Sequence, residues 1–345
     1  MGLHKCSCMF VPPRVLENLA KVGVEKARLS IQQSKISRTR RADKLVDMQA
    51  FIGTKTKAKS KRKVYDCQNT WEQRVKLVRA EGKPATGDED ADLVYKYAGN
   101  VRDYFNKVLQ RNSIDNKGMD LILNVHFGED YMNAFWDGDE MTFGDGDGEI
   151  FTSFTQSLDV VAHELAHGVT QFSADLEYFS QSGALNEHFS DVFGSAITQH
   201  VLMQDAGQAD WLVGNEIMGP TLYGEALRSM QAPGMAYDNN LLGKDPQPAH
   251  MNDYYAGNDD NQGVHINSGI PNRAFYLVSM EIGTDKAALI WYDALQKLWS
   301  SAKFNDAVEV IVESARMLTK QKQVPVGSTQ QVRAAFREVG LPHLT

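Results

Sequence analysis

The residues of this chain with the clearest chemical potential are His163, Glu164 and His167, spaced as H-E-x-x-H. Residues four apart on a helix lie on one face, one turn along, so both imidazoles can reach a single ion. Neutral imidazoles suit zinc, and a carboxylate beside them can take a proton from metal-bound water. The same pattern also arises on ordinary amphipathic helices, so it indicates a metal site only if a third ligand is found elsewhere.

Glu187, twenty residues after His167, is a candidate third ligand. Glu187 and Asp191 are four apart and share a face of the next predicted helix. A carboxylate from a neighbouring helix completes a His2Glu set with an open fourth position, which is typical of catalytic zinc. Asp191 can then accept the other ring N–H of a ligand imidazole. The alternative is two solvated acidic residues, and the presence of both motifs in one chain favours the metal site.

The elements that must position these residues are strands and turns early in the chain and helices later. Two Asp/Gly-rich stretches, 137–140 and 144–148, are expected to be hairpin turns, because neither has the Gly and Glu placement of an EF-hand. In the extended stretch over 64–82, Val64, Val75 and Leu77 are expected to face inward.

The predicted elements follow one another along the chain. They are a helix over 14–35, extended structure over 64–82, a helix over 92–112, a strand over 120–127, a helix over 183–204, a loop-rich region over 207–263 and helices over 285–301, 306–320 and 329–339.

This order predicts an α+β protein with two lobes and a groove between them, and 345 residues allow about two domains. The composition, 42% hydrophobic and 23% charged, is that of a soluble globular protein, and no apolar run has the length of a membrane span. Pro12, Pro13 and Arg14 interrupt the only short apolar run near the start, so no signal-peptide core is recognised. Three cysteines do not form a disulfide framework and are expected to be reduced thiols.

Charge is divided unevenly along the chain. Residues 1–63 hold 16 Lys and Arg against 4 Asp and Glu, a net +12, whereas the remainder holds 20 against 40, a net −20. The lysine-rich run at 53–63 has two interpretations, a nucleic-acid patch or an exposed, protease-accessible linker. The linker is favoured because no nucleic-acid-binding motif accompanies the run. We therefore expect neither a nucleic acid nor a membrane as partner.

Taken together, the motifs resemble the thermolysin family of neutral metallopeptidases (gluzincins, M4). The similarity covers about residues 64–342. The short N-terminal segment with Pro12-Pro13 resembles the protealysin-like branch, whose members carry a compact propeptide. The matching motifs are Asn133-Ala-Phe-Trp136, Asp145-Gly-Asp-Gly148, Asp159-Val-Val-Ala-His-Glu-Leu-Ala-His167, Ser182-Gly-Ala-Leu-Asn-Glu187, Ala226-Leu-Arg-Ser-Met230 and Asp260-Asn-Gln-Gly-Val-His-Ile-Asn-Ser-Gly269.

The resemblance implies a thermolysin-like fold with a β-rich N-terminal lobe, a central zinc-binding helix and a mainly α-helical C-terminal lobe. It implies one zinc per chain, held by His163, His167 and Glu187, with Glu164 as the general base. Asp191 is expected to orient His163. The implied activity is endopeptidase cleavage of peptides and proteins by a zinc-bound water.

The resemblance also assigns the residues around the metal. Tyr178 and His265 are expected to donate to the tetrahedral oxyanion, and Asp260 to orient the His265 ring. Cleavage on the amino side of Leu, Phe, Ile or Val is expected, because the family's pocket after the scissile bond is apolar. The expected lining residues of this pocket are Phe151, Phe154, Val160 and Leu227. The expected substrate-binding groups are Asn133, the Ala134 backbone and Arg228.

The chain departs from the family at the double calcium site of thermolysin. Of that cluster only Asp159, Asp210 and Glu216 remain. Calcium takes six to eight oxygen ligands, so the double site is predicted to be absent. The residues standing where further carboxylates belong are Thr198, Leu212 and Asn215.

The basic N-terminal segment is expected to be an inhibitory propeptide that blocks the active site until self-cleavage somewhere in 45–63. A thiolate from Cys6 or Cys8 could cap the zinc, but a steric block by the Pro12-Pro13 region is the preferred interpretation. A monomer is expected, either secreted by a non-standard route or stored in the cytoplasm. The expected divisions are a propeptide over 1–52, a basic linker over 53–63, a β-rich catalytic lobe with the zinc helix over 64–178 and a helical catalytic lobe over 179–345.

Two other functions were weighed against a zymogen endopeptidase. A zinc aminopeptidase would need a recognition group for a free amine, and none is identified in the sequence. A degenerate peptide-binding or adhesin-like protein would be expected to lose the base first, but Glu164, Tyr178 and His265 are all intact. The endopeptidase is therefore the favoured function.

Overall fold

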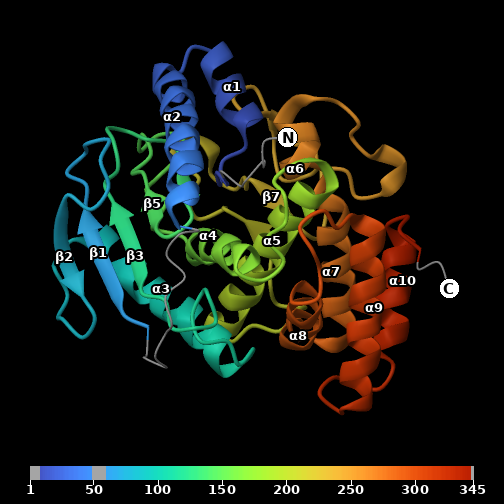
Figure 1. Ribbon diagram of the computed structural model, residues 1–345. Coiled ribbons are helices and arrows are strands. Elements are labelled where there is room, and N and C mark those ends of the chain that lie inside the picture. The colour runs from blue at the N-terminus through green and yellow to red at the C-terminus, as the bar shows by residue number, and fades with distance from the viewer. Residues whose placement is uncertain (1–7, 49–59, 343–345) are drawn as a thin grey trace.

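The computed structural model describes residues 8–48 and 60–342 (Figure 1). A sheet forms one side of the molecule and a group of helices, α7 to α10, forms the other, with α4 and α5 between them (Figure 1). The two N-terminal helices, α1 and α2, lie across the top of this arrangement in the same view. Within the described residues, no helix has both the length and the apolar character needed to cross a bilayer.

The sheet has five strands in the order β2-β1-β3-β5-β4. β1 pairs in parallel with β3, and β3 with β5, while β2 and β4 join antiparallel to their neighbours. β4 is therefore an edge strand whose outer side is open to further pairing. The strands are β1 (Arg62–Asp66), β2 (Lys76–Ala80), β3 (Leu121–Val125), β4 (Ala134–Trp136) and β5 (Met141–Phe143).

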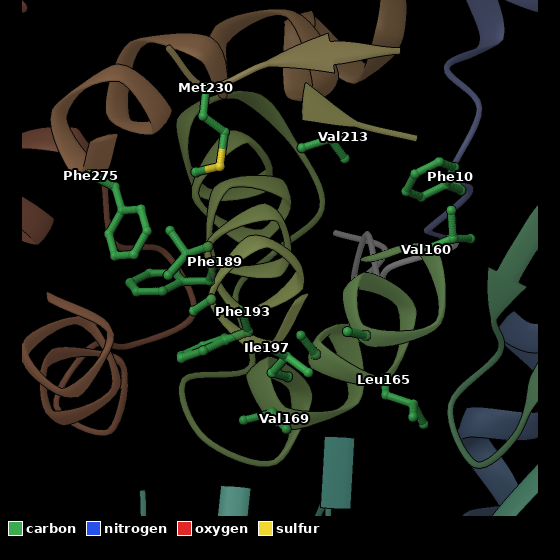
Figure 2. Close-up of a cluster of buried hydrophobic side chains, with 14 of the residues drawn as sticks. Phe10, Val160, Leu165, Val169, Phe189, Phe193, Ile197, Val213, Met230 and Phe275 are labelled. Carbon is green, nitrogen blue, oxygen red and sulfur yellow. The ribbon is translucent and has the colours of Figure 1, made fainter. Parts of the chain in front are cut away.

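Helices α4 (Leu158–Gln171) and α5 (Ser180–Leu202) form the centre of the molecule. Every residue of α4 before Gln171 is buried, as expected for a helix covered on all sides. On α5, Phe189, Phe193 and Ile197 follow at intervals of four and face the core together (Figure 2). This packing fixes the register of the two helices, and with it the direction of their polar side chains.

The remaining elements frame this centre. They are α1 (Pro13–Lys21), α2 (Glu25–Met48), α3 (Glu89–Lys107), α6 (Asp259–Asn267), α7 (Gly269–Ile282), α8 (Thr284–Leu295), α9 (Phe304–Lys320), α10 (Ser328–Glu338), the short strands β6 (Leu212–Val213), β7 (Arg228–Ser229), β8 (Asp238–Asn239) and β9 (Gly243–Lys244), and the 3-10 turns η1 (Pro220–Leu222) and η2 (Met251–Asp253).

Three sequence expectations about local structure are wrong. The helix predicted over 14–35 is two helices, because Gly23 adopts φ +97° between them, a conformation that ends a helix. Val75, just before β2, and Leu77 are 42% and 50% exposed, because alternate residues of a strand face opposite sides and Val78 is the residue of β2 that packs against the core. Residues 144–148 are not a hairpin turn but a loop, in which Asp147 Oδ1 accepts hydrogen bonds from following backbone N–H groups. The hairpin at 137–140 is confirmed, between β4 and β5.

The expected basic linker meets the body of the protein earlier than predicted. Ser60 is buried, and its carbonyl accepts a hydrogen bond from Arg102 at 2.7 Å. β1 begins at Arg62, whose guanidinium binds both oxygens of Glu81. Residues from Ser60 onward are thus fixed to the sheet, while 49–59 lie outside the described residues.

Candidate active site

Helices α4 and α5 bring three potential metal ligands to one point. His163 and His167 are one turn apart on α4, and their Nε2 atoms lie 3.0 Å from each other. Glu187 on α5 places Oε2 at 3.5 Å from Nε2 of His163 and Oε1 at 3.5 Å from Nε2 of His167. All three side chains are buried. Among the described residues, Glu187 Oε2 has no hydrogen-bond partner, so this set fits a bound cation.

Each imidazole is oriented through its other nitrogen. His163 Nδ1 lies 2.8 Å from Asp191 Oδ1, and His167 Nδ1 lies 2.8 Å from Asn186 Oδ1 and 3.0 Å from Ser190 Oγ. A proton on each Nδ1 leaves the Nε2 lone pairs directed at the common point, the arrangement typical of metal-binding histidines.

Asp191 is itself held by several partners. The Arg228 guanidinium binds both of its oxygens at 2.9 Å, and Asn272 Nδ2 donates to Oδ2 at 2.9 Å. Burial alone would raise the pKa of Asp191, but Arg228 and His163 hold that pKa well below its usual range. Asp191 therefore stays ionised and keeps its position beside His163.

Glu164 points from α4 into the same region. It is fully buried, and within the described part of the chain neither of its carboxylate oxygens has a hydrogen-bond partner. Burial raises the pKa of this carboxyl group to about 8. A carboxyl group with a pKa near neutrality and unused oxygens is suited to proton transfer.

Tyr178 and His265 both lie beside Glu187. The Tyr178 hydroxyl donates to Glu187 and lies 3.1 Å from His265 Nε2. His265 Nδ1 is 2.6 Å from Asp260 Oδ1, and the His265 backbone N–H donates to Oδ2 of the same carboxylate. Burial lowers the pKa of His265, but the carboxylates of Asp260 and Glu187 outweigh it and raise the pKa overall. The His265 ring is therefore biased towards the charged, doubly donating form.

An irregular turn positions Asp260 for this contact. Residues 260–263 all have positive φ, between +50° and +80°, at the start of α6. This left-handed path folds Asp260 back towards His265 five residues later. The local strain is offset by the two hydrogen bonds that Asp260 accepts from that residue.

Residues 8–11, the N-terminal segment, run across this site as an added strand. Met9 forms an antiparallel bridge with Phe135 of β4, and the Phe10 N–H donates to the Ala134 carbonyl at 3.1 Å. The Asn133 side chain accepts from the Val11 N–H at 2.9 Å and donates to its carbonyl at 3.2 Å. The open edge of β4 is therefore used to bind a peptide chain.

The carbonyls of the segment point at the polar groups of the site. The Met9 oxygen lies 3.0 Å from His265 Nε2, and Arg228 Nη1 donates to the Phe10 oxygen at 3.3 Å. The Phe10 ring meets the edge of His163 at 5.1 Å between ring centroids. Figure 2 shows Phe10 entering the core beside Val160 of α4.

All eleven site residues predicted from the sequence thus lie in one region, although they come from three helices, two strands and the segments between them. Sequence reasoning missed Asn186, Ser190, Asn272 and Phe10. Asn186 and Ser190 could have been suspected, because they share a helix with Glu187, whereas Asn272 carries no signal in the sequence.

The expectation that all three cysteines are reduced is wrong for Cys8, which is disulfide-bonded, while Cys67 is free.

Comparison with known proteins agrees with this geometry. Residues 28–171 match the family model "Thermolysin metallopeptidase, catalytic domain", and residues 174–341 match "Thermolysin metallopeptidase, alpha-helical domain". The chain belongs to the thermolysin family. The resemblance and the two-lobed α+β fold expected from the sequence are confirmed, and the chain is a zinc metalloendopeptidase of this family.

Individual relatives of this thermolysin-family enzyme include secreted proteases. An "Extracellular metalloprotease" of Pectobacterium carotovorum subsp. carotovorum is 47% identical over 84% of this chain and 84% of its own length. "Protease PrtS" of a Photorhabdus species is 43% identical over 95% of this chain and 92% of its own. The solved precursor of protealysin from Serratia proteamaculans is 41% identical, with a TM-score of 0.86, over 97% of this chain and 100% of its own.

Proposed function

We propose that His163, His167 and Glu187 hold one zinc ion and that the peptide bond to be split lies where Met9 and Phe10 are joined in this structure. The observation that carries the proposal is the placement of that peptide group. Its carbonyl oxygen is 3.0 Å from His265 Nε2, and its N–H is bonded to the Ala134 carbonyl. When bound, zinc supplies Lewis acidity that activates water and polarises the peptide carbonyl.

Each side chain around the proposed zinc has a separate role in hydrolysis. Glu164 takes the proton from the attacking water and returns it to the leaving amine, a transfer suited to its raised pKa. Tyr178 and His265 donate to the oxygen on which negative charge develops, and Asp260 fixes the His265 ring. Asp191 fixes the His163 ring in the same way.

The substrate backbone is held by three groups. Asn133 and the Ala134 carbonyl bind it as an extra strand on β4, as they bind residues 10 and 11. Arg228 holds the carbonyl of the residue after the scissile bond, where it now holds that of Phe10. The buried position of the Phe10 ring supports cleavage on the amino side of bulky apolar residues.

The enzyme is proposed to be made as a monomeric zymogen, with residues 1–52 as an intramolecular inhibitor. The segment 8–11 is buried and uses the binding groups that a substrate would need. We place self-cleavage before Ser60, because Ser60 and Arg62 are already fixed to the body. The proposed linker is therefore shortened from 53–63 to 53–59, residues 60–63 join the first catalytic lobe over 64–178, and the second lobe over 179–345 is kept as proposed.

We also propose that the double calcium site is absent and that the enzyme acts outside the cell. Two of the remaining carboxylates, Asp159 and Asp210, already accept hydrogen bonds from the backbone N–H groups of Gly214 and Leu212, respectively, which supports the first of these proposals. Relatives described as extracellular proteases support action outside the cell.

The test is hydrolysis of casein and of a short apolar peptide, with and without a zinc chelator. Activity should disappear with the chelator and return with zinc. Glu164→Gln should abolish activity while retaining zinc, and mass spectrometry should find its N-terminus uncut. Asp103→Asn, at a half-exposed position of α3 paired with Lys107, is the matched control. Normal processing of isolated Glu164→Gln would show that the cut is not made by this site.

A further inference from the structure

Cys8 lies at the proposed metal site without a role in the reaction above. It is fully buried and packs against Tyr178 and Val264. Its Sγ, a ring nitrogen of His167 and a carboxylate oxygen of Glu187 all lie within 4.8 Å of one another. A sulfur atom from the N-terminal segment is therefore held beside two of the three proposed zinc ligands.

The proposed zinc site has an open coordination position that suits a sulfur ligand. Three protein ligands leave one position of a tetrahedral zinc open, and thiolate is among the ligands that zinc binds best. Glu187 Oε2, buried without a hydrogen-bond partner among the described residues, is an independent sign that a cation belongs here. Tetrahedral zinc ligands lie about 3.5 Å apart. Since the three atoms lie within 4.8 Å of one another, the sulfur has to approach each of the other two by no more than about 1.3 Å.

The oxidation state of Cys8 decides whether this bond can form. Cys8 is disulfide-bonded in this structure, and zinc binds the thiolate rather than a disulfide sulfur. Cys67 is equally buried but differs from Cys8 in oxidation state and in place. It is a free thiol and belongs to a separate buried cluster with Met9 and Phe127. The two cysteines thus form a natural pair for comparison.

We propose that Cys8 is a redox-controlled ligand of the zymogen, which as a thiolate occupies the fourth zinc position and as a disulfide leaves that position open. This inference rests on the proposed zinc centre. Two molecules of a small thiol of the glutathione class reduce the disulfide, giving two cysteine thiols and one small-molecule disulfide. The Cys8 thiol then releases its proton to solvent as the zinc–sulfur bond forms. A small-molecule disulfide reverses the sequence.

This ligand explains how a substrate-like peptide can remain in the site uncut. The bond between Met9 and Phe10 contacts the groups proposed to act on a substrate. With the thiolate in the fourth position, the water needed for hydrolysis is excluded. The reduced zymogen is therefore latent, and oxidation opens the position from which processing can start.

The experiment uses the full chain carrying Glu164→Gln, so that it stays uncut, loaded with Co²⁺ in place of zinc. The visible d–d bands report metal at the site, and a sulfur-to-cobalt charge-transfer band in the near ultraviolet reports a thiolate ligand. The reduced protein should show both, and the oxidised protein only the d–d bands. Cys8→Ser should lose the charge-transfer band and keep the d–d bands, whereas Cys6→Ser and Cys67→Ser should keep both when reduced.

Failure of this inference is distinguishable from failure of the zinc site. Reduced protein with d–d bands but no charge-transfer band, or a charge-transfer band that survives Cys8→Ser, overturns the Cys8 ligand and leaves the site intact. Absence of d–d bands that depend on His163 overturns the zinc centre itself. If Cys8→Ser does not fold, X-ray absorption of the reduced zinc protein decides, because a sulfur neighbour at about 2.3 Å is expected and a shell of nitrogen and oxygen alone contradicts the proposal.

Discussion

Asp191 connects the metal site to the substrate-binding side of the molecule. One oxygen accepts from His163 and from Arg228, and the other accepts from Arg228 and Asn272. All of these groups are buried, so each charge depends on its partner. Arg228 in turn reaches the Phe10 carbonyl. One carboxylate thus holds both a proposed zinc ligand and the residue proposed to grip the substrate.

Asp191→Asn tests this connection without changing the size of the side chain. The amide cannot provide the same charge for His163 and Arg228, so the His163 ring should lose its fixed orientation. Zinc affinity should fall about 10- to 100-fold, measured by competition with a chromophoric chelator. Asp103→Asn is the control, and equal zinc affinities in the two variants would contradict the role given to Asp191.

At the scale of elements, the catalytic helices were predictable and their surroundings less so. The H-E-x-x-H spacing and the pair at 187 and 191 locate α4 and α5, because metal ligands must share helix faces. The positive φ of Gly23 and the exposure of Val75 and Leu77 were not predictable, because tertiary position decides them. The left-handed turn at 260–263 is likewise invisible in the residue types, yet it places Asp260.

His126 joins two elements of the sheet lobe through charge. Its ring lies 3.0 Å from Asp145 and 3.0 Å from Asp88, the residue that caps α3. The hydrogen bond with Asp145 raises the pKa of His126 to about 10, with Asp88 adding to the effect and burial opposing it. An imidazolium between two carboxylates therefore links the end of β3, the 145 loop and the start of α3.

His126→Gln should lower the free energy of unfolding at pH 6 by about 2 kcal/mol, the loss expected for charge-assisted hydrogen bonds. Because the folded pKa is raised, the contribution is complete below the unfolded pKa of about 6.5 and is lost as pH rises through about 10. The difference between parent and variant in urea unfolding should therefore shrink between pH 6.5 and 10. His200→Gln removes an exposed pair with Asp285 and should change little. A difference that is independent of pH would contradict a charged His126.

At the scale of the whole molecule, residues 1–63 carry a net charge of +12 and the remainder a net charge of −20. Two ion pairs that join α2 to the rest of the protein, Lys26 with Asp130 and Arg40 with Glu72, are exposed. Exposed pairs contribute about 0–1 kcal/mol each and are screened by salt. The buried residues 8–11 should hold the inhibitor far more strongly than these charges do.

Phe10→Ala in the full chain tests which contacts keep the enzyme latent. Removing a buried aromatic ring costs about 3 kcal/mol, which would raise the fraction of open molecules about 100-fold. The initial rate of hydrolysis of a short peptide by uncut protein should rise accordingly, with intact mass confirming that no processing has occurred. Leu29→Ala, at a position 48% exposed on α2, is the control and should leave the rate unchanged. If high salt activates the uncut parent as strongly as Phe10→Ala does, the charges rather than the buried segment hold the inhibitor in place.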